Sequence, residues 1–308
     1  RQRVLETIRS RNDRPAQRAY QIGLKDLFGD HPHGLPLEGE EEPIRHLTAE
    51  QLRQHYHEHY GSRPPAISVV GHFDATRVLH RLIAAFPSAR TPRRPVPLAP
   101  EVEVLKPEGD QPRLVELDRS QVQVVRTVPG VAIGDQREPE LMLLLEILGG
   151  SSGRLFQALR EERGLTYGVS ADAVIGLRGG AVTIHFSTAP ERLKEGLSAL
   201  DAALDLFVKD GPTPAEVERA RRYLKGARRV TGQTAMSRCQ EIVLDVVYGL
   251  GLGRSESLDK ALDAVGPEQI RRLADQLFVK DGVHTVLLGP QPKEEPQAPS
   301  VSQLHGPT

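Results

Sequence analysis

The chain has 308 residues, enough for about two domains that each bury a sizeable core. Lys and Arg number 40 against 41 Asp and Glu, and no long basic run occurs, which argues against nucleic acid as a partner. The single cysteine, Cys239, cannot form an internal disulfide and lacks the neighbouring ligands of a structural zinc site. Because no apolar run reaches the roughly 18 residues that span a bilayer, the composition predicts a soluble, globular chain.

The first 90 residues are predicted to be mostly helical. Two helices come first, and the chain starts without a capping residue, as if within a helix. A turn-rich loop at 29–43 precedes a helix from about Thr48 to Tyr60 and a short apolar strand, Ala66 to Val70. One more helix runs to about residue 88.

A proline-rich segment at 91–112 without periodicity is the predicted linker. After it, strands come first and long amphipathic helices follow, which predicts an α+β fold with helices on one face of a mixed, largely antiparallel sheet. The polar tail at 291–308 is predicted to be disordered. The predicted strands of this second domain, 113–290, lie at 114–118, 121–128, 166–175, 181–189 and 284–289.

Part of the first half recurs in the second half at a constant spacing. Three matches are each separated by 218 residues: Glu50–Arg53 with Glu268–Arg271, Tyr60 with Phe278, and Val69–Gly71 with Leu287–Gly289. A helix, a strand and a glycine in one register indicate duplication of a whole domain. Residues 1–90 are therefore predicted to be the rear part of a first domain whose front half, about a hundred residues, is not in this chain.

The letters HYHEH, beginning at His55, spell the inverted zinc motif H-x-x-E-H. On a helix His55 and His59 share one face, where both could bind zinc while Glu58 acts on a bound water. Zinc needs a third protein ligand, which this motif does not supply. The repeat favours semi-buried packing histidines instead, because His55 and His59 align with Leu273 and Leu277. We therefore predict no bound metal in this chain and keep the motif as the alternative.

A second candidate segment, 149–167, reads GGSSGRLFQALREERGLTY. It predicts a glycine turn, a serine cap and a short helix that ends at Gly164, and its glycine spacing is not that of a phosphate loop. Arg160 leaves the last turn of this helix and Tyr167 opens the next strand, so both could donate hydrogen bonds to a peptide carbonyl or carboxylate. Strand alternation leaves another interpretation open, in which Tyr167 lies beside Val169 on an apolar face and belongs to the core.

Two parts of the sequence resemble the insulinase/pitrilysin-type metallopeptidases, or inverzincins, particularly their shorter bacterial and processing-peptidase-type members. They are SSGRLFQALREERGLTYGV with the preceding LGG, and HPHGLPLEGEEEPIRHLTAEQLRQHYHEHYGSRPPAISVVG. The resemblance extends to about Pro290 and implies two homologous α+β domains that form one half of a clamshell. It also implies that Arg160 and Tyr167 match an arginine and a tyrosine that the half without zinc presents to the bound peptide.

The resemblance places the family's zinc motif upstream of Arg1, so that HYHEH lies in a different helix. The family's third zinc ligand is a glutamate in a V-L-x-E-I helix, and here Thr7 occupies its place in VLETI. A threonine hydroxyl is a poor zinc ligand, and Glu6 is turned by about 100° from the ligand face. The chain therefore resembles a non-catalytic homologue.

The leading hypothesis is a substrate-binding subunit, inactive alone, that presents Arg160 and Tyr167 to a peptide at the zinc site of a homologous subunit or of a second copy. An extended peptide would pair with a sheet edge. The alternatives are a zinc endopeptidase whose metal-binding half is missing from this chain, and a subunit that serves assembly only. The sequence leaves open whether such a subunit works in the bacterial periplasm or cytoplasm.

Overall fold

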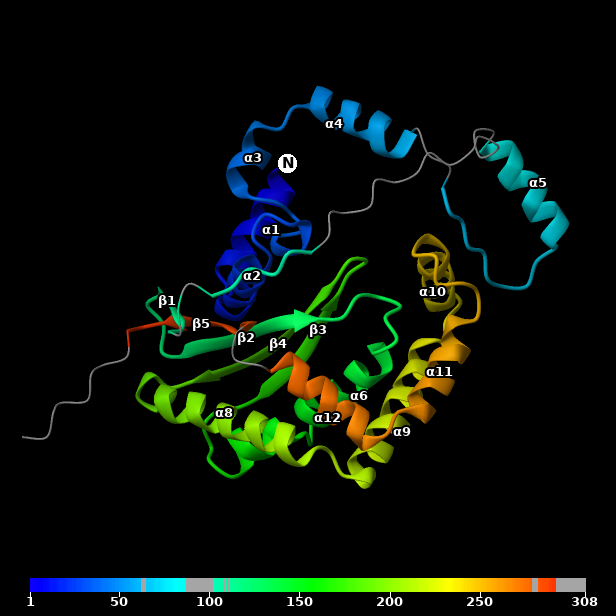
Figure 1. The fold of residues 1–308 in the computed structure, drawn as a ribbon. Helices are drawn as coiled ribbons and strands as arrows, with labels where there is room; N and C mark the ends of the chain where they lie inside the picture. The colour runs from blue at the N-terminus through cyan, green and yellow to red at the C-terminus, as the bar shows by residue number, and fades with distance from the viewer. Residues whose placement is uncertain (62–64, 87–101, 108, 110, 279–281, 292–308) are drawn as a thin grey trace, which may run out of the picture.

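The structure, a computed structural model, describes residues 1–61, 65–86, 102–107, 109, 111–278 and 282–291. One five-stranded sheet lies at the centre with helices on both of its faces (Figure 1). Within the described ranges, no helix is both long and apolar enough to cross a membrane. Most of the predicted linker and nearly all of the predicted tail lie outside these ranges.

The sheet has the strand order β1-β5-β2-β4-β3, in which β1 and β5 are parallel and the other neighbours are antiparallel. Its strands are rich in valine, which suits a pleated and largely buried surface. The predicted α+β class with a mixed, largely antiparallel sheet is confirmed. The strands are β1 Arg113–Glu116, β2 Val122–Gly130, β3 Val169–Ile175, β4 Gly180–Thr188 and β5 His284–Gly289.

Long amphipathic helices cover one face of the sheet and form the main core with it. Pro214 and Pro267 occupy the first turns of two of them, where the missing N–H costs no hydrogen bond. Phe186 of β4 and Phe207 are among the largest fully buried side chains of this core. The helices on this side are α6 Glu138–Gly149, α8 Leu193–Asp210, α9 Pro214–Thr231, α11 Arg254–Ala264 and α12 Pro267–Leu277.

The other face of the sheet is covered by α2 (Pro15–Phe28), which α1 (Gln2–Asn12) accompanies. The prediction that helices cover only one face is therefore wrong. Small residues let α2 approach the sheet: Ala19 is fully buried against β2 and β5, and a Cβ on Gly23 would lie 2.5 Å from Thr127 Oγ1. Apolar contact with the strands thus fixes a helix of the first 90 residues to the sheet of the second domain.

The described residues from Glu41 to Ala85 extend away from the sheet (Figure 1). The predicted loop at 29–43 contains a 3-10 turn, η1, and the start of a helix, α3. The predicted helix from Thr48 ends in a π-helical turn, η2. The predicted strand at Ala66 to Val70 is not formed, because no described strand lies beside it. The elements are η1 Pro32–Gly34, α3 Glu41–His46, α4 Ala49–Tyr56, η2 His57–Gly61 and α5 Ala75–Ala85.

Helix boundaries follow the spacing of the repeat. α3 ends at His46 and α11 at Ala264, and α4 begins at Ala49 and α12 at Pro267, so both pairs are separated by 218 residues. Thr48 caps α4 through a box with Gln51, and Gly266 takes the equivalent position before α12. These boundaries agree with the duplication, and the division at 91–112 stays a prediction.

Candidate functional site

A glycine turn, a short helix and the start of β3 form a corner that carries Arg160 and Tyr167. The helix is α7 (Arg154–Phe156), continued by the π-helical turn η4 (Gln157–Glu161), and it buries Leu155 and Leu159. The predicted serine cap is not formed, since Gly153 precedes the helix and makes no side-chain bond. The predicted end at Gly164 is confirmed: its φ of 57° lies in the left-handed region, and its N–H donates to the Arg160 carbonyl at 2.9 Å.

Both side chains of the predicted pair are exposed to solvent. Tyr167 is 82% exposed, and the Arg160 guanidinium carbon lies 4.8 Å from the centre of the Phe156 ring, which supports it by a cation–π contact. The alternative placement of Tyr167 in the core is wrong. β3 begins only at Val169, so that strand alternation does not extend back to Tyr167.

Three residues that the sequence analysis missed fix the loop around Tyr167. Thr188 donates from Oγ1 to the Leu165 carbonyl at 2.8 Å. Arg192 donates to the carbonyls of Gly164 and Arg163 at 2.9 and 3.0 Å. The Thr166 hydroxyl donates to the Gly168 carbonyl at 2.8 Å and accepts from the Gly168 N–H at 3.2 Å. The tyrosine is thus an exposed side chain on a restrained backbone. No periodic signal could have indicated the contacts of Thr188 and Arg192, because they join side chains to backbone atoms that are 23 to 29 residues away.

Arg154 anchors the front of the same helix. Its guanidinium donates to both Glu216 carboxylate oxygens at 2.8 Å and to the Gly211 carbonyl at 2.8 Å, and it stacks on the Phe207 ring at 4.9 Å. The bond from Arg154, followed by those from Thr213, lowers the pKa of Glu216 to about 2. This ion pair therefore remains charged over the neutral range and holds α7 against α8 and α9.

The corner opens at the edge of the sheet. β3 pairs with β4 on one side and has no second neighbour among the described strands. An edge strand offers unpaired backbone N–H and carbonyl groups to an extended peptide. Arg160 and Tyr167 both lie before the first residue of this strand. Chemically, the arrangement provides an exposed guanidinium and an exposed phenol on the segment that leads into an edge strand.

The HYHEH helix does not assemble a metal site. The rings of His55 and His59 lie 4.3 Å apart between centroids, and Gln54 donates to Glu58 at 2.9 Å. Over the ranges that the structure describes, no three His, Cys, Asp or Glu side chains are grouped so as to hold a metal ion. The predicted packing of His55 and His59 is not found among the described residues, because α4 buries no residue and both histidines are exposed.

Thr7, at the position of the expected rear ligand, lines a cavity of about 850 Å³ between α1, α2 and the strands β3 and β4. Its hydroxyl donates to the Arg3 carbonyl at 3.0 Å, an ordinary bond within a helix. His185 lies across the cavity, where burial lowers its pKa and the negative charge of Asp172 acts in the opposite direction. The Nε2 atom of His185 lies 3.0 Å from Gln123 Oε1. These residues do not supply a zinc ligand set.

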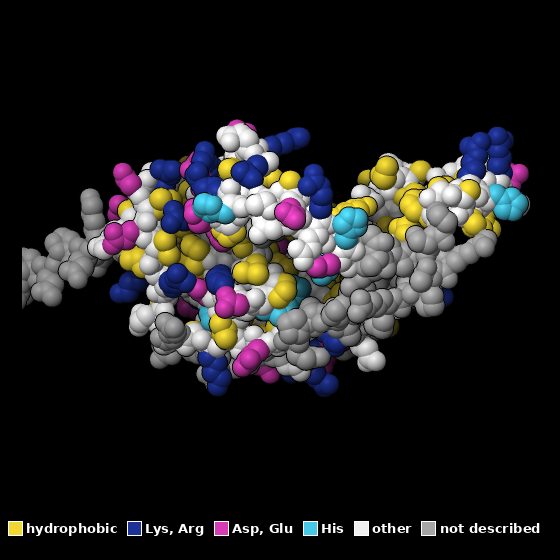
Figure 2. All heavy atoms as spheres, turned by 90° about the horizontal axis from the view of Figure 1, so that it is seen from above, with side chains coloured by type: hydrophobic (Ala, Val, Ile, Leu, Met, Phe, Trp, Pro, Cys, Tyr) yellow, Lys and Arg dark blue, Asp and Glu magenta, His cyan; other side chains and the backbone are white. Residues whose placement is uncertain are grey.

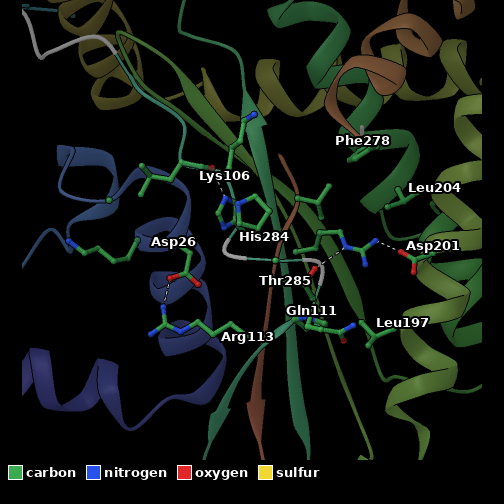
Figure 3. Close-up of a pocket in the computed structure, with 18 of the residues that line it drawn as sticks. Asp26, Lys106, Gln111, Arg113, Leu197, Asp201, Leu204, Phe278, His284 and Thr285 are labelled. Carbon is green, nitrogen blue, oxygen red and sulfur yellow. Dashed lines mark hydrogen bonds and ion pairs between the residues drawn. The ribbon is translucent and has the colours of Figure 1, made fainter. Parts of the chain in front are cut away.

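The larger cavity, about 1210 Å³, lies elsewhere and is lined by the segment after residue 104, α2, α8, β2 and β5 (Figure 3). Its charged groups largely pair with each other: Arg113 with Asp26, and Arg126 with Asp201. His284 bonds the Leu105 carbonyl at 2.8 Å. The cavity therefore lies between the end of the predicted linker and the sheet, and neither Arg160 nor Tyr167 lines it.

The comparison with known protein families assigns the chain to the M16 peptidases. The family model described as the peptidase M16 inactive domain matches residues 46–224, more than half of the chain, and the chain belongs to this family. The resemblance to the insulinase/pitrilysin type is thereby confirmed.

Curated relatives carry names that point to zinc in the family. The chain is 28% identical to an uncharacterized zinc protease of Bacillus subtilis over 90% of this chain and 67% of that one. It is 30% identical to one of Streptomyces coelicolor over 73% of this chain and 50% of that one. The chain thus spans about half to two thirds of the length of these relatives.

Solved structures share the fold. A peptidase M16 inactive domain from Pseudomonas fluorescens superposes with a TM-score of 0.79 at 24% identity, covering 96% of this chain and 70% of that one. A chain of complex III from Candida albicans superposes with a TM-score of 0.77 at 13% identity, over 94% and 70%. At these identities the likeness concerns the fold alone.

Proposed function

We propose that this chain is the substrate-binding, non-catalytic part of an M16 peptidase and presents Arg160 and Tyr167 to a peptide at the zinc site of a homologous partner. One observation carries the proposal: a tyrosine that is 82% exposed stands on a loop held by Thr188 and Arg192. A large aromatic side chain that is held rigidly in solvent is typical of a binding surface.

The pair suits a peptide backbone. The guanidinium of Arg160 and the phenol of Tyr167 both donate hydrogen bonds, and a peptide carbonyl accepts them. β3, the edge strand that follows Tyr167 in the chain, would supply further backbone groups. The peptide would lie extended along this edge while the zinc-bearing partner cleaves it. Thr7 and the isolated HYHEH motif support a role in which the chain itself brings no metal.

A peptide titration tests the proposal against a purely structural role. An extended peptide substrate of the zinc-bearing partner is titrated against the parent chain and against Arg160→Ala and Tyr167→Phe, and binding is followed by fluorescence anisotropy. Loss of a hydrogen bond to the charged arginine is expected to weaken binding by roughly ten- to a hundredfold, equivalent to about 1.5–3 kcal/mol. Tyr167→Phe removes only the hydroxyl and is expected to weaken binding less.

Arg163→Ala is the matched control, because it is an exposed arginine of the same corner outside the proposed pair. Its side chain bonds Glu162 and the Ala158 carbonyl, and its loss is expected to leave binding unchanged. If the parent and both variants of the pair bind the peptide equally, the proposed role is wrong and the chain serves assembly.

A further inference from the structure

The loop that carries Tyr167 is bonded to an arginine outside the segment 149–167. Arg192 is the last residue of the 3-10 turn η5 (Pro190–Arg192), which lies between β4 and α8. Basic and acidic side chains are interspersed on the face of the molecule that Figure 2 shows, and an exposed ion pair between two of them contributes little to stability. Arg192 differs from such residues, because its guanidinium also donates to the consecutive carbonyls of Arg163 and Gly164, at 3.0 and 2.9 Å.

The two carbonyls lie just after the end of the helix that carries Arg160. Beyond η4, which ends at Glu161, a carbonyl has no helical partner and needs water or a side chain to donate to it. Here side chains take this place: Arg192 bonds the carbonyls of residues 163 and 164, and Thr188 bonds that of Leu165 at 2.8 Å. The backbone is therefore held at consecutive positions immediately before Thr166 and Tyr167.

The residues that bond the loop are themselves fixed to the sheet and to α8. Thr188 is fully buried on β4, where it pairs with Val122 of β2. The Arg192 guanidinium also donates to Glu195 Oε2, in the first turn of α8, at 2.9 and 3.1 Å. Because Tyr167 is exposed, packing of its ring does not decide where the phenol stands. Its position follows from the backbone, and the backbone is bonded to β4 and α8.

Arg160 is fixed in a different way. It lies on η4, whose Leu159 is fully buried, and its guanidinium rests on the Phe156 ring. The bonds from Arg192 begin only after this helix has ended. Loss of Arg192 would therefore leave the anchors of Arg160 in place and release the loop that leads to Tyr167.

We propose that Arg192 is a positioning residue for Tyr167, which sets the place of the phenol relative to Arg160 without itself binding the peptide. The inference rests on the proposed function and adds to it a residue outside the motif. A loop that is already restrained loses little conformational freedom when a peptide binds, so the restraint raises affinity. An arginine with a structural role alone would change the stability of the chain and leave this affinity as it is.

Hydrogen exchange measures the restraint without any peptide. The N–H groups of Gly164, Leu165 and Gly168 all donate hydrogen bonds, so their exchange reports opening of the loop. In the 308-residue chain, Arg192→Ala is expected to raise the exchange rate of the amides in 164–168 at least about fivefold. Unchanged exchange in this variant would overturn the inference.

Arg221→Ala is the matched control for both measurements. Arg221 likewise donates to two backbone carbonyls, those of Leu262 and Val265, each at 2.9 Å, and it pairs with Glu218 three residues away. Its bonds lie between α9 and the end of α11, away from the loop of Tyr167. Its loss is therefore expected to leave the exchange of this loop and the affinity for peptide unchanged.

A double-mutant cycle shows whether Arg192 acts through Tyr167. The peptide titration is repeated with Arg192→Ala, with Tyr167→Ala and with the two substitutions combined. Arg192→Ala is expected to weaken binding roughly two- to tenfold when Tyr167 is present, and less than about twofold when its side chain is already removed. Arg192→Lys is expected to restore only part of the affinity, because an ammonium lacks the planar fork that donates to two carbonyls.

The outcomes separate this inference from the proposed function. Equal losses from Arg192→Ala with and without the Tyr167 side chain would overturn the positioning role. A loss of the same size in Arg221→Ala would also overturn it, since stability and not position would then determine the affinity. A parent chain that binds no peptide would overturn the proposed function, and the inference with it. If the inference alone is wrong, the parent chain still binds and Tyr167→Phe still weakens the binding.

Discussion

At the residue scale, the site depends on contacts that join side chains to distant backbone atoms. The position of Arg160 at a helix end and of Tyr167 shortly before a strand could be predicted from their motif, because a helix end, a glycine and a strand follow one another within a few residues. Their role in binding rests on the resemblance and stays a prediction. The contact of Arg192 could not be predicted, since it reaches the carbonyl of Gly164 across 28 positions. Tyr167 itself was ambiguous, because strand alternation alone cannot show where a strand begins.

The Arg154–Glu216 pair allows a pH prediction at this scale. The native pKa of Glu216 is about 2, below its ordinary 4.5, so the pair stabilises the fold above pH 4.5 and loses this effect as the pH falls toward 2. We expect Glu216→Gln to lower the free energy of unfolding by about 2–3 kcal/mol at pH 7 and by much less near pH 3. Urea unfolding at both pH values measures this difference.

Glu268→Gln is the control for this prediction. The pKa of Glu268 is also lowered to about 2, through bonds from Arg271 and Arg272, but its side chain is 55% exposed against 16% for Glu216. Because solvent screens an exposed pair, its loss is expected to change stability far less. Equal effects of the two substitutions would show that the bonds of Glu216 to Arg154 and Thr213 do not stabilise α7.

At the scale of elements, the sequence predicted the strands and long helices of 113–290 well, because their periodicity is local and strong. It failed where an element depends on a distant partner. Residues 66–70 have the composition of a strand, yet a strand forms only where a neighbour supplies hydrogen bonds. The packing of α2 on the sheet of 113–290 could not be predicted either, because the sequence of an amphipathic helix does not specify which surface it covers.

Substitutions of two helical glycines test whether α2 packs closely on the sheet. Gly23→Ala is expected to destabilise the chain by about 1 kcal/mol or more, since its Cβ would lie 2.5 Å from the buried Thr127 hydroxyl. Gly226→Ala in α9 meets nothing within 4 Å and is expected to stabilise the chain by up to about 1 kcal/mol through helix propensity. Thermal unfolding measures both changes. Stabilisation by both would mean that α2 does not lie close to β2.

At the scale of the whole molecule, we expect peptide binding by this chain and metal binding by its partner to be separate. The described residues group no three metal-binding side chains, and His55 and His59 stand on an exposed helix. We expect the chain, dialysed against zinc and then against buffer, to retain no stoichiometric metal in elemental analysis. Retention of one equivalent that disappears in His55→Ala would contradict this expectation.

We propose that Arg160 and Tyr167 act in the cleavage of peptide by another subunit. The most direct measurement is the kcat/KM of the zinc-bearing partner, assayed with and without this chain. We expect the chain alone to be inactive and the parent chain to raise the kcat/KM of the partner. With Arg160→Ala in place of the parent chain, kcat/KM is expected to be roughly ten- to a hundredfold lower, while the melting temperature of the variant is unchanged. Tyr167→Phe is expected to lower kcat/KM less. Full activity with both variants, or chelator-sensitive cleavage by the chain alone, would contradict the account.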